Sequence, residues 1–129
     1  MSHIPDNLKF TTSHEWVQLA DDGTASIGIT DHAQLMLGDL VYVELPETGD
    51  DLAKGKECAV VESVKAASDV YAPVSGQVIA GNEKLADAPE IINENPYVAG
   101  WLFRLRLSDA AELDDLLDAA AYREIVETY

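Results

Sequence analysis

A single lysine, Lys65, lies in a setting that suits covalent attachment of a cofactor. No other Lys or Arg occurs between Lys56 and Lys84. Runs rich in β-branched residues, 59–61 and 70–74, flank it and predict two strands. The residues between these runs are short, which predicts a hairpin with Lys65 at its tip. Such an amine can be acylated by an enzyme and can then carry the attached group to other active sites. Solubility alone could also explain a surface lysine.

The rest of the chain offers no catalytic constellation. The histidines His3, His14 and His32 have no nucleophile in a recognisable motif, and no glycine-rich phosphate loop occurs. Cys58 is the single cysteine, so we expect no internal disulfide, no zinc site and a packed thiol. A Schiff base on Lys65 would need a buried amine in a pocket, and an apex among Ser and Ala residues offers little burial. These observations favour a carrier, whose cofactor supplies the chemistry.

The charge of the chain limits its partners. The sequence has 24 acidic and 8 basic residues, a net charge of −16. This charge argues against nucleic acid and anionic membranes, and it suits docking on basic patches of partner enzymes. There is no apolar run long enough to span a bilayer, and the first residues resemble neither a signal peptide nor an Arg-rich presequence. We therefore expect a cytoplasmic protein of bacterial type.

The elements around the hairpin are predicted to be mostly strands. Trp16 and the apolar residues after it form a strand, and the turn at Asp21-Asp22-Gly23 leads into a return strand, 24–29. Thr30 caps a helix over 31–37, with Gly38 at its C′ position. Further strands are expected at 39–45, where side chains alternate, and at 57–64, 77–80 and 101–107, the last with Trp101 on an apolar face.

The C-terminal part of the chain is predicted to be helical. Pro89 opens a short helical turn through residue 92, and residues 109–127 form a helical tail. Asp109 and Glu112 have the spacing of a capping box. The 129 residues thus form one domain, mainly β with short helices, in which Lys65 lies at one end of a flattened β-sandwich or barrel.

The segment around Lys65 resembles the lipoyl-lysine segment of the glycine cleavage H protein. This segment reads Glu62-Ser63-Val64-Lys65-Ala66-Ala67-Ser68-Asp69-Val70-Tyr71-Ala72-Pro73-Val74-Ser75-Gly76. Other segments resemble the same family in the expected order, and the match covers nearly all of the chain: Ser13-His14-Glu15-Trp16, Gly28-Ile29-Thr30-Asp31-His32-Ala33-Gln34, Leu37-Gly38-Asp39-Leu40-Val41, Val43-Glu44-Leu45-Pro46, Asn95-Pro96-Tyr97 and Gly100-Trp101-Leu102.

The resemblance implies a lipoyl-domain-like fold (a hybrid barrel-sandwich) with lipoic acid in amide linkage to Lys65. Glu62 would help a lipoate ligase or octanoyltransferase to recognise the hairpin. Ser13, Glu15 and Asp69 occupy positions that resemble the cleft in which proteins of the family dock the lipoyl-lysine side chain, called the arm below. No metal is implied, and we expect a non-catalytic monomer.

The resemblance also implies three partner enzymes. The arm would accept an aminomethyl group from a pyridoxal-phosphate glycine decarboxylase and present it to a tetrahydrofolate-dependent aminomethyltransferase. Dihydrolipoamide dehydrogenase, a flavin enzyme that passes electrons to NAD, would reoxidise it.

Related carriers fit the sequence less well. A lipoyl domain of a 2-oxo acid dehydrogenase normally lies beside linkers and catalytic domains, which this chain lacks. Biotinyl domains have Met on both sides of the lysine, where this chain has Val64 and Ala66. An H-like protein that mainly donates lipoyl groups to other enzymes stays open as an alternative.

Overall fold

Two antiparallel sheets form the body of the protein in the computed structural model, which describes residues 4–20 and 22–127. His3 and Asp21 therefore lie outside the described residues. The larger sheet has the strand order β1-β2-β3-β9-β8-β5, and the smaller has the order β4-β6-β7. The strands are β1 (Lys9–Phe10), β2 (Glu15–Leu19), β3 (Thr24–Ile29), β4 (Leu40–Glu44), β5 (Asp51–Leu52), β6 (Glu57–Ser63), β7 (Ala67–Tyr71), β8 (Gly76–Gly81) and β9 (Phe103–Leu107).

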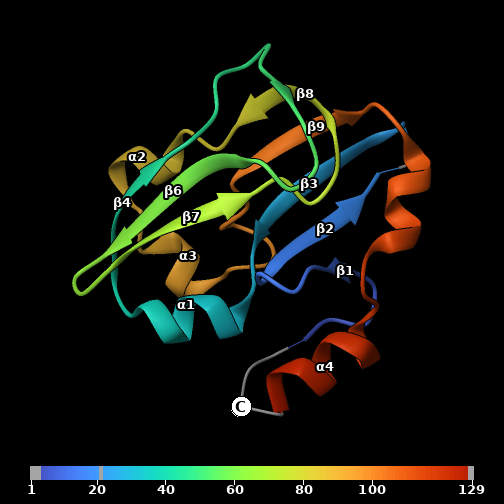
Figure 1. Cartoon of the computed structure of the whole chain (residues 1–129). Coiled ribbons are helices and arrows are strands. Elements are labelled where there is room, and N and C mark those ends of the chain that lie inside the picture. The colour runs from blue at the N-terminus through green and yellow to red at the C-terminus, as the bar shows by residue number, and fades with distance from the viewer. Residues whose placement is uncertain (1–3, 21, 128–129) are drawn as a thin grey trace.

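The main core lies between the two sheets. Figure 1 shows the three-stranded sheet in front of the larger one, with the β6–β7 hairpin projecting past α1 (Asp31–Leu37). Buried side chains from both sheets share one apolar cluster, which includes Ile27, Val43, Val61, Val70 and Leu105. The prediction of a mainly β, sandwich-like fold with short helices is confirmed, and the sheets do not close into a barrel.

The predicted helix after β3 has the expected bounds and caps. Thr30 Oγ1 accepts a hydrogen bond from Ala33 N and so caps α1. Gly38 ends the helix with a φ of 84°, a conformation that favours glycine. Two one-turn helices, α2 (Lys84–Asp87) and α3 (Ile91–Glu94), follow β8. Among the described residues, no helix is long and apolar enough to cross a membrane.

The strict alternation expected along 39–45 is wrong, because β4 contains a bulge. The pairing with β6 shifts between Leu40, opposite Ser63, and Tyr42, opposite Glu62. The residue between them, Val41, is exposed together with Tyr42. A bulge places one extra residue against the partner strand, so consecutive side chains need not alternate between faces.

The C-terminal tail is two helical segments rather than one. The 3₁₀ helix η1 (Ala110–Asp115) is followed by α4 (Ala119–Glu127). Between them, Leu117 and Phe10 exchange two backbone hydrogen bonds of 2.8 Å. This bridge to β1 interrupts the helix that the sequence predicts, because the tertiary pairing satisfies the same backbone groups.

The predicted capping box is half formed. Asp109 Oδ1 accepts a hydrogen bond from Ala111 N, as an N-cap should. Glu112 instead accepts hydrogen bonds from Ser75 N at 2.7 Å and Ser75 Oγ at 3.0 Å. The carboxylate therefore ties the tail to the loop before β8.

Trp101 is less buried than the sequence predicts. The strand β9 begins at Phe103, and Trp101 before it is only half-buried. Trp16 is the fully buried tryptophan, and its indole N–H donates to Pro96 O at 3.0 Å. Gly28 lies opposite Trp16, and a Cβ there would meet the indole ring at 2.5 Å. The ring thus covers a position that admits only glycine.

Candidate functional site

Lys65 lies at the exposed tip of a tightly bonded hairpin, as predicted. β6 and β7 pair up to Glu62 and Ala67, and Ser63 N donates to Ala66 O at 2.7 Å to close the turn. The buried Ser63 hydroxyl lies within hydrogen-bond distance of Lys65 N at 3.2 Å and Ala66 N at 3.1 Å. The Ser63 side chain therefore holds the backbone at Lys65 in a fixed conformation.

The end of α1 supports the tip from one side. Val64 N donates to Asp39 O at 3.0 Å. Lys65 Cε would lie 3.6 Å from a Cβ built on Gly38, so the lysine stem runs beside the glycine that ends α1. The base of the side chain is thus positioned, while the residue remains exposed at the apex.

Two acidic residues of the predicted site share the outer face of the hairpin. Residues directly opposite in an antiparallel pair point to the same face, and the face repeats every second residue. Glu62 is opposite Ala67, and Asp69 is opposite Val60, so Glu62 and Asp69 lie on one side. Glu62 is half-buried, whereas Asp69 is exposed.

Glu15 is buried and links the two sheets. Only 2% of its surface is exposed, and its Oε2 accepts a hydrogen bond of 3.2 Å from Tyr71 N on β7. Its Oε1 accepts hydrogen bonds of 2.6 Å from the hydroxyls of Thr11 and Ser13. Burial raises the pKa of Glu15, and these hydrogen bonds oppose that rise.

The predicted cleft residues are therefore brought together only in part. Ser13 and Glu15 are in direct contact, and Glu15 reaches β7 two residues after Asp69. Within the described part of the chain, no hydrogen bond joins Glu15 to Asp69 or Lys65. The structure thus gives the positions of these residues, and their role toward an arm stays a prediction.

Comparison with known proteins decides the family. The model of the glycine cleavage H-protein family matches residues 8–129. A glycine cleavage system H protein from Chromohalobacter salexigens is 60% identical over 126 residues, covering 98% of this chain and 96% of that protein. One from Aeromonas hydrophila is 57% identical over 127 residues, covering 98% of both.

The chain belongs to the glycine cleavage H-protein family. A solved H-protein structure from Mycobacterium marinum agrees, with a TM-score of 0.87 and 40% identity over 94% of this chain and 97% of that one. The role expected from the motifs, lipoyl carrier of the glycine cleavage system, is confirmed. Nothing in these comparisons favours a main role as a lipoyl donor.

Sequence reasoning missed two residues of this H-protein site. Thr11 is one: its hydroxyl donates to Glu15 Oε1 and accepts a hydrogen bond of 3.1 Å from Glu15 N. His14 is the other: it has a φ of 72°, and His14 N donates to Thr11 O. That left-handed residue folds the loop so that Thr11 faces Glu15. Nothing in the local sequence marks a histidine for this conformation.

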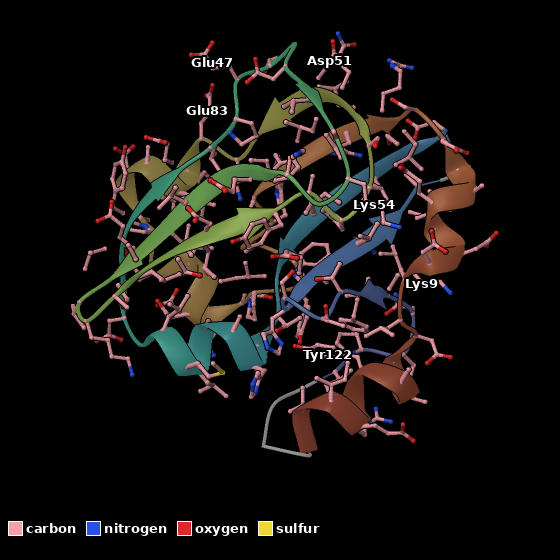
Figure 2. All side chains as sticks on the ribbon, in the orientation of Figure 1. Lys9, Glu47, Asp51, Lys54, Glu83 and Tyr122 are labelled. Atoms are coloured by element: carbon pink, nitrogen blue, oxygen red, sulfur yellow. The ribbon has the colours of Figure 1, made fainter. Side chains whose placement is uncertain are left out.

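His14 also joins the site to α4. Its Nδ1 lies 2.8 Å from the Tyr122 hydroxyl, which lies 2.7 Å from Thr30 Oγ1, the cap of α1. Figure 2 shows Tyr122 pointing from α4 toward the strands, where it stacks on Phe10 with ring centroids 4.6 Å apart. Burial, and then the charge of nearby His32, lower the pKa of His14.

Cys58 is a packed thiol, as expected. Its Sγ donates to Val70 O at 3.3 Å, and burial raises its pKa to about 12. A thiol of such high pKa is a poor nucleophile. Across the described residues, no group of three or more His, Cys, Asp or Glu side chains could hold a metal ion.

Proposed function

We propose that Lys65 carries lipoic acid in amide linkage and presents it to the enzymes of the glycine cleavage system. The observation that supports this most is the exposed lysine on a turn fixed by Ser63 and by the Asp39 carbonyl. A fixed attachment point lets the arm swing while its base stays still.

The residues of the hairpin favour acylation of this amine. The exposed Lys65 amine can attack the carbonyl of an activated lipoyl donor, forming the amide bond as the leaving group departs and a proton passes to solvent. Glu62, three residues before Lys65 on the outer face, is proposed to help the lipoate ligase or octanoyltransferase recognise the hairpin.

Once attached, the dithiolane supplies a disulfide that can take up an aminomethyl group and be reoxidised. Lysine and the lipoyl chain contain about ten single bonds, which gives a reach of roughly 14 Å at standard bond lengths. That reach lets one docked carrier serve an active site recessed below a partner's surface. Tethering also raises the effective concentration of the group there.

The partners proposed are those of the glycine cleavage cycle. They are the pyridoxal-phosphate glycine decarboxylase, the tetrahydrofolate-dependent aminomethyltransferase, and dihydrolipoamide dehydrogenase with FAD and NAD. The net charge of −16 favours docking on basic surfaces of these enzymes.

Ser13, Glu15 and Asp69 are proposed to shelter the ammonium of the loaded arm. Glu15 is a buried carboxylate that receives hydrogen bonds only from neutral donors in the described part of the chain. Burial raises the pKa of Glu15 more than these hydrogen bonds lower it. An arriving cation would stabilise the charged form. Asp69 is exposed in the middle of β7, two residues before Tyr71, which Glu15 contacts.

Reconstitution with the three partner enzymes tests this function. We expect glycine-dependent NADH formation with the lipoylated protein and its complete loss in Lys65→Arg, because Arg keeps the charge but does not accept the lipoyl group. Lys56→Arg, an exposed lysine at the start of the same hairpin, is the matched control and should retain full activity. Equal activity of the two variants would contradict the proposal.

A further inference from the structure

Exposed apolar side chains gather around Lys65. In the part of the chain that the structure describes, eight large hydrophobic side chains are exposed, and five of them belong to the elements that meet at the hairpin tip. Four of these five form what we call the tip patch: Leu35, Val41, Tyr42 and Val64; the fifth, Met36, lines a hollow with His14, His32 and Ile125 of α4 instead. Scattered exposed apolar residues need no explanation, but a cluster marks a contact surface.

The geometry brings the tip patch next to the lysine. Val64 precedes Lys65, and its N–H is bonded to Asp39 O. Leu35 lies in the last turn of α1, within one helical turn of Gly38, beside which the Lys65 side chain runs. Figure 1 shows this end of α1 beneath the projecting hairpin.

The bulge in β4 adds the remaining two side chains. It lies where Leu40 and Tyr42 pair with Ser63 and Glu62, at the last residues before the tip. Val41 and Tyr42 are both exposed there, at 55% and 50%. Bulges occur often beside functional sites, where they redirect side chains. Here the bulge turns two adjacent large side chains outward beside the lysine.

Acidic residues surround the tip patch. Asp39 and Glu44 are exposed beside it on the α1–β4 segment, and Glu62 and Asp69 lie on the outer face of the hairpin. A partner must therefore offer an apolar contact with basic residues around it. A second copy of this chain, with its own charge of −16, does not meet that requirement.

We propose that the tip patch is the docking surface of the enzyme that acylates Lys65; this inference rests on the proposed function. The acylating enzyme differs from the other partners in how close it must come to Lys65. Before modification no arm exists, so the acylating enzyme must bring its own active site to the ε-amine and contact the residues beside it. The cycle enzymes meet the far end of an arm of roughly 14 Å. Their contacts can lie elsewhere on the acidic surface.

The chain contains matched controls for a test. Val64 and Val98 are 70% and 73% exposed, and Leu35 and Leu19 are 57% and 55% exposed. Val98 and Leu19 lie outside the tip patch, in the segment before β9 and at the end of β2. Each pair can receive the same change to Ser at nearly equal exposure.

The experiment measures kcat/KM for lipoylation of the full-length unmodified protein by a purified lipoate ligase with lipoate and ATP, followed by intact mass. We expect Val64→Ser and Leu35→Ser to lower kcat/KM about tenfold, the typical effect of losing one apolar contact in a recognition site. Val98→Ser and Leu19→Ser should stay within about twofold of wild type.

A second readout uses the same proteins after complete lipoylation. Their reoxidation by dihydrolipoamide dehydrogenase should stay within about twofold in every variant, because that enzyme meets the end of the arm. The inference would be overturned if patch and control variants lost kcat/KM for lipoylation to the same extent. It would also be overturned if the patch variants lost reoxidation rate as strongly as they lost kcat/KM for lipoylation. A wild-type dimer that the patch variants abolish would overturn it too, because it would assign the patch to self-association.

Failure of this inference can be told from failure of the proposed function. If the wild-type protein is acylated at Lys65 and the patch variants are acylated as fast, only this inference fails. Wild-type protein that is not acylated at Lys65 removes the proposed function and the inference with it.

Discussion

At the scale of single residues, the shelter proposed for the arm centres on a buried carboxylate. Glu15 is held by the hydroxyls of Thr11 and Ser13 and by Tyr71 N–H, and its pKa is raised by burial. An ammonium on the arm would complete this arrangement. Attraction of about 1–3 kcal/mol for such a pair leaves roughly 15% down to 1% of arms undocked. Docking of that strength would protect the aminomethyl group and stay reversible.

Neutral replacements of these carboxylates should shorten the life of the loaded arm. We expect Glu15→Gln to release ammonia several-fold faster than wild type, because an amide attracts an ammonium far less than a carboxylate does. Asp69→Asn should act in the same direction. The measurement is ammonia release over time from the isolated loaded protein.

Glu112→Gln provides the control for this experiment. Glu112 also accepts two hydrogen bonds in a partly buried position, from Ser75, but on the C-terminal tail. Its replacement should leave ammonia release unchanged. If Glu15→Gln and Asp69→Asn hold the aminomethyl group as long as wild type does, neither carboxylate shelters the arm.

Part of this site could be predicted from the sequence. Lys65 and its turn follow from local signals: short residues between β-branched runs. Thr11 could not be predicted, because its contact with Glu15 depends on the positive φ of His14, and a positive φ is uncommon for any residue other than glycine. The buried state of Glu15 likewise depends on β7, more than fifty residues away in sequence.

At the scale of elements, one hydrogen-bonded junction connects three segments near the site. Tyr122 on α4 contacts His14 in the loop before β2 and Thr30 at the start of α1. Burial raises the pKa of Tyr122 to about 12, so the phenol keeps its proton at neutral pH. The junction therefore changes its charge through the His14 imidazole and not through the phenol.

The contribution of His14 to stability should depend on pH. Because its folded-state pKa is lowered, the unfolded chain binds the proton more readily, and stability falls as pH drops through about 6.5. We expect His14→Asn, which tolerates a positive φ, to cost about 1 kcal/mol at pH 7.5 from the lost hydrogen bond. That cost should shrink toward pH 5.5.

Urea unfolding of the two proteins across this pH range measures the difference. The comparison cancels the opposite contribution of Glu15, whose raised pKa makes the folded protein gain stability as pH falls. A constant gap between wild type and His14→Asn, or one that widens at low pH, would contradict the assignment.

Elements with strong local signals were predictable, and those set by long-range contacts were not. The helix α1 has its cap, its apolar residues and its terminal glycine in the sequence, and its bounds were predicted correctly. The bulge in β4 and the break before α4 have no such signal. They arise from pairing with β6 and from the Phe10–Leu117 bridge, which are tertiary contacts.

At the scale of the whole molecule, two packed sheets hold every proposed site residue on strands or tight turns. Figure 1 shows the hairpin projecting from this body at one end. The net charge of −16 attracts basic surfaces of partner proteins. The body therefore positions the arm, and movement is left to the attached group.

The most direct test is the intact mass of the protein after incubation with lipoate ligase, lipoate and ATP. The account predicts a mass increase of one lipoyl group, located on Lys65 by peptide mapping and absent in Lys65→Arg. Modification that persists in Lys65→Arg, or that maps to another lysine, would contradict it.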